Sequence, residues 1–244
     1  MLGYCPGLLG GQRNGRRPKE PAVNLSNDEL LTTTRAVRKR LDFEKPVTRD
    51  VIERCLELAV QAPNGGNMNS WRWIVIDDPD IVAKAADIYR GGMADFIASF
   101  DDDGYVGKNV PGADRIETST THLLENFHRS PALLLPLIPG RTDPPGPQTH
   151  VFWQACQWGS IVQAVWSFML ALRARGLGSA WTTAHLWREQ DMADLLGIPH
   201  NIYMQVGLFP IAYTLGTDFK PAHREPLSTV LGWNGFPTPG STGA

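Results

Sequence analysis

The sequence predicts an α+β fold, in which helices pack against a sheet, rather than a doubly wound parallel sheet. Several segments repeat apolar residues at the three- and four-residue spacing of amphipathic helices, whereas short β-branched, aromatic or fully apolar runs are typical of strands. The two patterns do not alternate in the strict β-α-β order that a parallel sheet requires.

Composition agrees with a globular enzyme that can bury a substantial core. The chain has 244 residues, of which 42% are hydrophobic and 20% are charged, and this length allows one large domain or two small ones. The net charge of −2 argues against general nucleic-acid binding. Three widely separated cysteines favour neither a disulfide framework nor a zinc ribbon, and we expect Cys55 and Cys156 to be buried. The six histidines have no metal-ligand spacing, so we expect no metal site.

The two ends of the chain differ from the middle. Residues 1–25 place an apolar stretch before a cluster of arginines, which is the reverse of a secretory signal, and we expect a mobile extension there. We expect one domain over residues 26–235 and a loose, turn-rich tail over residues 236–244. No apolar run approaches the length of a bilayer-spanning segment, so we expect a cytoplasmic protein that does not engage a membrane.

The first half of the domain contains clear helix and strand signals. Ser26 and Glu29 form a capping box that opens a helix, and Thr48 caps the next helix, whose apolar face repeats at Ile52, Cys55 and Ala59. Residues 71–76 are short, aromatic and β-branched, which predicts a strand. Asp78-Pro79 then starts another helix.

The second half begins with a difficult stretch. The segments Gly91-Gly92, Asp101-Asp102-Asp103-Gly104 and Pro111-Gly112 are typical helix breakers, so residues 93–100 are predicted as a separate short helix. Residues 91–112 as a whole suit a lid or an arm over a partner. Further on, we predict strands at residues 132–138 and 178–183, a helix that is apolar all round at residues 161–172, a short helix at residues 188–196, and an apolar run at residues 202–215 that Gly207 and Pro210 interrupt.

A polar loop joins the second predicted helix to the first predicted strand. Pro63 ends the helix, Gly65 and Gly66 permit positive φ angles, and the amides of Asn64, Asn67 and Asn69 can both donate and accept hydrogen bonds. Such a loop suits a flat heteroaromatic ligand. On its own, however, its composition favours a plain helix–strand connector.

Basic residues stand at two distant places in the chain. Arg35 and Arg38 are three residues apart, which puts them on one side if the turn is helical, and Arg224 follows far downstream. Guanidinium groups make bidentate bonds with phosphate. Taken alone, the run of residues 35–40 is also typical of a solvated basic face, and we expect Lys39 and Arg40 to face solvent or to steer a phosphorylated nicotinamide.

These segments occur in the order found in the FMN-dependent nitroreductase family, which the chain resembles from about residue 30 to residue 233. The resemblance implies a mainly antiparallel sheet flanked by helices and an intertwined homodimer with FMN between the subunits. By position, it implies a phosphate site formed by Arg35, Ala36, Val37, Arg38 and Arg224. The flavin would be lined by Pro63, Asn64, Gly65, Asn67 and Asn69 of the partner subunit, and its ring by Trp181, Thr182 and Thr183. For Trp181, core packing remains an equal alternative.

The sequence departs from the family pattern at several of these positions. Thr34 stands where many relatives carry an arginine, and Ala36 replaces the usual serine. Arg40, Asn69, Ser70 and Ala222 also differ from the common residues. These changes keep the charge that FMN needs but suggest an outlying subfamily, so a substrate cannot be carried over with the fold.

The resemblance implies an NAD(P)H-dependent oxidoreductase that reduces nitroaromatic, quinone or related flat acceptors in a ping-pong cycle. The nicotinamide would be a visiting substrate, because no strand-linked Gly-x-Gly-x-x-Gly is present. No residue is predicted to be a catalytic nucleophile or general base. A related flavin reaction (by a dehalogenase, ene reductase or dehydrogenase), a flavin-binding protein without turnover, and a nucleic-acid binder using residues 35–40 remain alternatives.

Overall fold

The computed structural model describes residues 23–100, 112–143, 146 and 150–237. These residues form a six-stranded sheet with strand order β1-β6-β3-β2, in which β4 also pairs with β6 and β5 with β3. All five strand pairings are antiparallel. The strands are β1 (Leu41–Asp42), β2 (Arg72–Ile76), β3 (Ala132–Pro139), β4 (Leu177–Gly178), β5 (Tyr203–Gln205) and β6 (Phe209–Thr214). The predicted α+β class with an antiparallel sheet is therefore confirmed.

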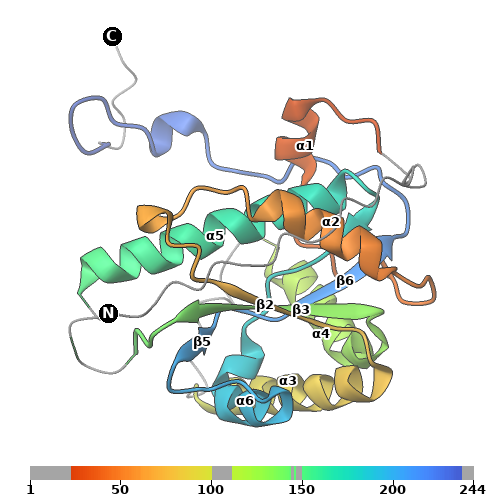
Figure 1. Cartoon of the computed structure of the whole chain (residues 1–244). Helices are drawn as coiled ribbons and strands as arrows, with labels where there is room; N and C mark the ends of the chain where they lie inside the picture. The colour runs from red at the N-terminus through yellow and green to blue at the C-terminus, as the bar shows by residue number, and fades with distance from the viewer. Residues whose placement is uncertain (1–22, 101–111, 144–145, 147–149, 238–244) are drawn as a thin grey trace, which may run out of the picture.

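Helices cover both faces of this sheet, as Figure 1 shows. The α2 helix (Arg49–Ala59) and the α5 helix (Val151–Arg173) pack on one face, where Ile52, Phe168 and Phe209 are fully or almost fully buried. The other face is covered by α3 (Pro79–Ala98), α4 (Ala113–Asn126) and α6 (Glu189–Leu196), around buried Leu133 and Phe127. The short α1 helix (Asn27–Thr33) lies at the edge of the first layer.

Local capping signals are good guides to where the helices begin. Both bonds of the predicted capping box are present at Ser26 and Glu29, and the Asp78 carboxylate accepts from the first-turn amides of α3. The α6 helix ends at Leu196, as predicted, and Gly197 follows it with a φ of 66°. Thr48 precedes α2 as expected, but its side chain makes no capping hydrogen bond.

The predicted break at Gly91-Gly92 is wrong, because α3 continues through both glycines as far as Ala98. A Cβ on Gly92 would lie 2.1 Å from the carbonyl oxygen of Ala184, at the start of the 3-10 helix η5 (Ala184–Arg188). The missing side chain therefore lets η5 approach α3 and does not interrupt the helix. The proposed lid over residues 91–112 falls partly outside the described residues, which omit residues 101–111.

Several other boundaries differ from the prediction. The α5 helix starts at Val151, ten residues before the predicted start at residue 161, and α4 was not predicted. The strand expected over residues 178–183 is reduced to β4 and an isolated bridge between Thr182 and Leu208. Most of residues 1–25 and 236–244 lies outside the described residues, so the predicted extension and tail remain predictions.

The α5 helix meets the length and composition of a membrane-spanning helix. Those two criteria alone are weak evidence, because the central helix of a globular domain satisfies them as well. Along this helix, Ile161, Val165, Phe168 and Leu172 are fully buried in the protein's own core.

Candidate flavin site

The basic turn, by which we mean residues 34–40, is not helical. Residues 34–37 have no regular secondary structure, so the condition that would place Arg35 and Arg38 on one side of a helix is not met. The backbone N–H of Val37 donates to the carbonyl of Ser179 at 2.8 Å, and the Val37 side chain is buried. This bond fixes the turn beside β4, while Arg35 and Ala36 stay exposed and Arg38 is half-buried.

The chain returns to this turn after the last strand. We call residues 215–221 the strap and residues 222–237 the arm. Nη1 of Arg35 donates to the carbonyl of Lys220 at 3.1 Å, a contact between residues 185 positions apart. Arg224 stands four residues beyond this contact and is exposed, with Nη1 bonded only to the adjacent His223 carbonyl among the bonds described. The strap therefore brings the start of the arm back to Arg35.

Two arginines hold the strap through cation–π contacts with one aromatic ring. The guanidinium of Arg40 lies 4.3 Å from the ring centre of Phe219, and that of Arg173 lies 4.9 Å from it. Arg40 also pairs with Asp218 and donates to the Leu215 carbonyl at 2.8 Å. Arg40 is thus a structural contact and does not simply face solvent, which corrects the expectation for this residue.

Arg173 is the least expected member of this group. Only 4% of its surface is exposed, and Nη2 donates to Thr33 and to the Thr217 carbonyl, while Nε and Nη1 are buried without a hydrogen-bond partner. Burial, together with the nearby charge of Arg40, lowers its pKa. Among the described residues, its guanidinium forms no ion pair, and it lies at the C-terminal end of α5, where a positive charge is favourable.

The asparagine loop is braced by its own amides. Nδ2 of Asn64 donates to Oδ1 of Asn69 at 3.0 Å, and the backbone N–H of Asn69 donates back to Oδ1 of Asn64 at 2.9 Å. Gly66, Asn67 and Asn69 adopt positive φ angles of 60°, 52° and 49°. Gly65 does not, so only one of the two glycines serves the predicted purpose. Pro63, Asn67 and Asn69 are exposed, and Asn64 is half-buried.

Ser160 of α5 holds this loop in place through a hydrogen bond with its backbone. Its hydroxyl oxygen accepts from the backbone N–H of Gly65 at 2.9 Å, and the hydroxyl donates to the Cys156 carbonyl at 2.5 Å. Sequence reasoning missed this residue, because a serine inside an apolar helix has no distinguishing pattern. The predicted burial of Cys55 is correct, whereas Cys156 is only half-buried.

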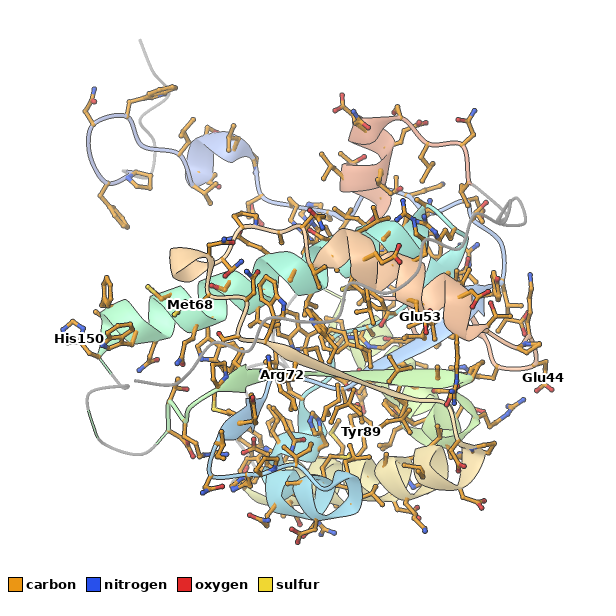
Figure 2. The ribbon with its side chains drawn as sticks, in the orientation of Figure 1. Glu44, Glu53, Met68, Arg72, Tyr89 and His150 are labelled. Atoms are coloured by element: carbon orange, nitrogen blue, oxygen red, sulfur yellow. The ribbon has the colours of Figure 1, made fainter. Side chains whose placement is uncertain are left out.

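A cavity of about 470 Å³ opens between the loop, the N-terminal half of α5 and the end of β3; we call it the loop cavity. Asn64, Gly65 and Met68 line it from the loop side, and Trp153, Gln157 and Ser160 line it from α5. Figure 2 shows Met68 beside this half of α5 and His150 at the helix start. A volume of this size suits a small organic ligand.

The third predicted segment has one buried and two more exposed members. Thr182 is buried, and its backbone carbonyl accepts from the Leu208 N–H at 2.9 Å, whereas Thr183 is exposed. Nε1 of Trp181 donates to the Val206 carbonyl at 3.2 Å, and its ring lies 5.2 Å from that of Phe209. These contacts give Trp181 a packing role on the α5 side of the sheet.

Tyr89 links this segment to the basic turn. It is buried between α3 and the sheet (Figure 2), and its ring stacks on Phe127 at 4.3 Å. Burial raises the pKa of Tyr89, whereas the charge of Arg38 and a hydrogen bond with Thr182 act in the opposite direction. The phenol therefore lies within reach of both predicted ring and phosphate residues. The sequence showed it only as part of a helical stripe.

A second polar cluster lies beside α6. Burial raises the pKa of Glu189, but bonds from Arg141 at 2.7 Å and from the Gln205 N–H at 2.8 Å outweigh it and lower the pKa overall. The neighbouring His185 is fully buried, and burial lowers its pKa to about 4. His185 is therefore neutral at pH 7 and packs in the core as an uncharged side chain. In the described ranges, no three His, Cys, Asp or Glu side chains are placed to hold a metal ion.

Comparisons with known proteins agree with this geometry. A model of the nitroreductase family matches residues 31–213. The 5,6-dimethylbenzimidazole synthase of Rhodospirillum rubrum is 28% identical over 169 residues, which are 67% of this chain and 72% of that protein.

Two solved structures show the same fold. A BluB-like flavoprotein from Clostridium difficile 630 superposes with a TM-score of 0.65 at 19% identity, over 86% of this chain and 99% of that one. The FMN- and NADPH-dependent nitroreductase NfnB from Sphigopyxis sp. strain HMH superposes with a TM-score of 0.62 at 21% identity, over 87% and 100% of the two chains. The family model covers residues 31–213, from within α1 to β6, and this match shows that the chain belongs to the nitroreductase family.

Proposed function

We propose that this protein is an FMN-dependent oxidoreductase that passes hydride equivalents from NAD(P)H to a nitroaromatic, quinone or similar electron-poor acceptor by a ping-pong mechanism. The observation that carries the proposal is the bond between Arg35 and the Lys220 carbonyl. It joins the basic turn to Lys220, four residues before Arg224, and this supports the proposal that two distant parts of the chain supply cations to one region. A dianionic phosphate is the ligand that such a region fits.

The described residues fit the cofactor in three ways. Arg35, Arg38 and Arg224, with the backbone of Ala36 and Val37, would hold the phosphate. The buried guanidinium of Arg173 adds positive charge to the same side of the molecule. The loop residues Pro63, Asn64, Gly65, Asn67 and Asn69 would line the flavin, and Trp181, Thr182 and Thr183 would lie along its ring.

When bound, FMN supplies the hydride chemistry, and the protein supplies binding and orientation. The Val37–Ser179 bond places the basic turn at a fixed position relative to Trp181 and Thr182. The bonds among Asn64, Asn67 and Asn69 keep the loop in one conformation before any ligand arrives. We assign no side chain of this site as a catalytic nucleophile or general base.

We further propose a homodimer, because large apolar side chains are exposed on two elements. On the arm, Trp233 and Phe236 are 84% and 90% exposed, and on the first turns of α5, Val151 and Phe152 are 74% and 57% exposed. Exposed apolar surface of this kind marks an interface. In Figure 1 the arm runs away from the body of the domain, as a segment that wraps a second subunit would. We assign residues 26–235 to this single domain, in a cytoplasmic protein.

The test begins with the full-length protein purified without added cofactor. We expect a yellow protein that releases FMN on denaturation and whose visible flavin absorption is bleached by NADH or NADPH in a stopped-flow experiment. Arg38→Ala and Arg224→Ala should each weaken FMN binding by on the order of 1.5–3 kcal/mol, the value of a charge-assisted hydrogen bond. Arg54→Ala, which removes a surface ion pair on α2, is the matched control. Unchanged affinity in both phosphate-site variants would contradict the proposed site.

A second function within the same family has one observation in its favour. The curated relative from Rhodospirillum rubrum is a 5,6-dimethylbenzimidazole synthase, so a flavin reaction other than acceptor reduction is the alternative. It predicts retained FMN and no steady-state reduction of nitroaromatics or quinones by NAD(P)H. A flavin-binding protein without turnover would give the same result, and reduction of FMN by NAD(P)H alone would then separate the two.

A further inference from the structure

Arg173 joins two segments that are distant in the sequence. One nitrogen of its guanidinium, Nη2, donates to Oγ1 of Thr33 at 3.3 Å and to the carbonyl of Thr217 at 2.9 Å. Thr33 is the last residue of α1 and directly precedes the basic turn, whereas Thr217 lies in the strap. Arg173 therefore forms a bridge from α5 to both segments at once, which we call the Arg173 bridge.

The Arg173 bridge stands beside the contact that unites the proposed phosphate site. Arg35 follows Thr33 by two residues, Lys220 follows Thr217 by three, and Nη1 of Arg35 donates to the Lys220 carbonyl at 3.1 Å. Two residues of chain span at most about 7 Å. The bridge therefore restricts where Arg35 can lie relative to the strap.

The neighbours of Arg173 hold its guanidinium in one orientation. The Thr33 hydroxyl donates its hydrogen to the Glu29 carbonyl at 2.6 Å, which leaves Oγ1 free to accept from Arg173. The guanidinium lies 4.9 Å from the ring centre of Phe219, and only 4% of the residue is exposed. Because a guanidinium is planar, its donors then point in fixed directions.

Stability alone does not explain an arginine at this position. Nε and Nη1 are buried without a hydrogen-bond partner, and burying a cation in this way is costly. The end of α5 and the ring of Phe219 offset part of the cost. An uncharged side chain of similar length would lose less hydration here, but it could not form the bridge.

We infer that Arg173 is a positioning residue of the phosphate site, which holds the basic turn against the strap so that Arg35 meets the phosphate in one geometry. This inference rests on the proposed function. Arg173 acts through Arg35 and does not itself touch the ligand. Flavin binding should therefore depend on Arg173 only when the ligand carries a phosphate.

The experiment compares FMN with riboflavin, which has the same ring and ribityl chain but no phosphate. The full-length protein is freed of flavin, and the affinity for each ligand is measured by the quenching of flavin fluorescence. Arg173→Met keeps an unbranched stem but removes the donors and the charge. It should weaken FMN binding by about 10-fold, because a charge-assisted contact is misplaced, and riboflavin binding by less than about 2-fold.

Arg175→Met is the matched control. It removes the same charge two residues further along the chain, and the hydrogen bond described for Arg175 is with the Ala171 carbonyl of α5. This variant should change neither affinity. If it weakens FMN binding as much as Arg173→Met does, the loss comes from total charge, and the inference is wrong.

A double-mutant cycle separates positioning from a direct effect of charge. If Arg173 acts through Arg35, Arg173→Met should weaken FMN binding by less than about 3-fold in a protein that already carries Arg35→Ala. A loss of about 10-fold in both backgrounds would mean that Arg173 attracts the phosphate on its own, and would overturn the inference.

A milder variant keeps the test valid if Arg173→Met does not fold. Thr33→Val is nearly isosteric and removes only one end of the Arg173 bridge. It should weaken FMN binding by about 3-fold and leave riboflavin binding unchanged. Unchanged FMN binding, or an equal loss for both flavins, would contradict the inference.

The outcomes also separate this inference from the proposed function. If Arg38→Ala and Arg224→Ala leave FMN affinity unchanged, the proposed phosphate site fails. If both weaken FMN binding while Arg173→Met affects FMN and riboflavin equally, or affects neither, the phosphate site stands and only the role of Arg173 is wrong.

Discussion

Replacing Gly92 with alanine is expected to force α3 and η5 apart, whereas the same change at Gly91 is expected to be tolerated. A Cβ at Gly92 would lie 2.1 Å from the carbonyl oxygen and 2.9 Å from the carbonyl carbon of Ala184, both of which are backbone atoms. A Cβ at Gly91 would lie 2.3 Å from Nη1 of Arg188, which is the far end of a flexible side chain. The two positions are adjacent in one helix and differ only in what they face.

The magnitudes follow from this difference. Either substitution gains about 1 kcal/mol of helix propensity. At Gly92 the backbone must shift by more than 1 Å, at the upper end of the roughly 1–3 kcal/mol that overpacking costs, so we expect a net loss of about 2 kcal/mol. At Gly91 the Arg188 side chain can turn away from its exposed partner Asp95, whose loss costs little. We therefore expect Gly91→Ala to be neutral or slightly stabilising.

Urea unfolding of the two variants in parallel measures both free energies. The variants should differ by about 2–3 kcal/mol, with Gly92→Ala the less stable. Because Ala184 directly follows Thr183, Gly92→Ala should also weaken FMN retention when the fold is intact. Equal stability of the two variants would refute the argument that close approach, and not helix interruption, explains the glycine at residue 92.

Two other predictions concern His185 in the core and Phe219 in the strap. The pKa of His185 is about 4 in the folded state against 6.5 for the free side chain, so the unfolded state binds more protons between these values and stability is lost as the pH falls through this range. Between pH 7 and pH 4.5, the free energy of unfolding of the wild type, measured with urea, should fall by about 2.5 kcal/mol more than that of His185→Gln. If the two free energies fall in parallel with pH, this prediction is wrong. Phe219→Leu removes the ring between Arg40 and Arg173, so it should destabilise the protein by about 2 kcal/mol and make the arm more sensitive to protease. Phe219→Tyr, which keeps the ring, should retain the stability and the protease resistance of the wild type. An unaltered cleavage rate in Phe219→Leu would show that the arm is held elsewhere.

The features that the sequence predicted well are those with a local cause. The capping box at Ser26, the start of α3 at Asp78 and the end of α6 at Gly197 depend on a few neighbouring residues, and each lies where the pattern put it. The apolar run at residues 132–138 is equally local, because a fully buried strand needs no alternation.

The features that it missed depend on contacts between distant residues. The strands β1 and β4 have two residues each and exist because both pair with β6. Three other contacts arise only when the chain has folded. Arg173 becomes buried, Arg40 contacts the ring of Phe219, and Ser160 bonds to the loop. A glycine that permits close approach looks the same in a sequence as one that ends a helix, which explains the error at Gly91-Gly92.

The position of β6 has a consequence for how the arm is anchored. This strand pairs with β1, β3 and β4, so opening it requires three ladders to separate. The amides of Ile211 and Tyr213 are therefore expected to be among the slowest to exchange with solvent deuterium. Since the strap begins directly after Thr214, the arm is rooted in the part of the molecule that is expected to open last.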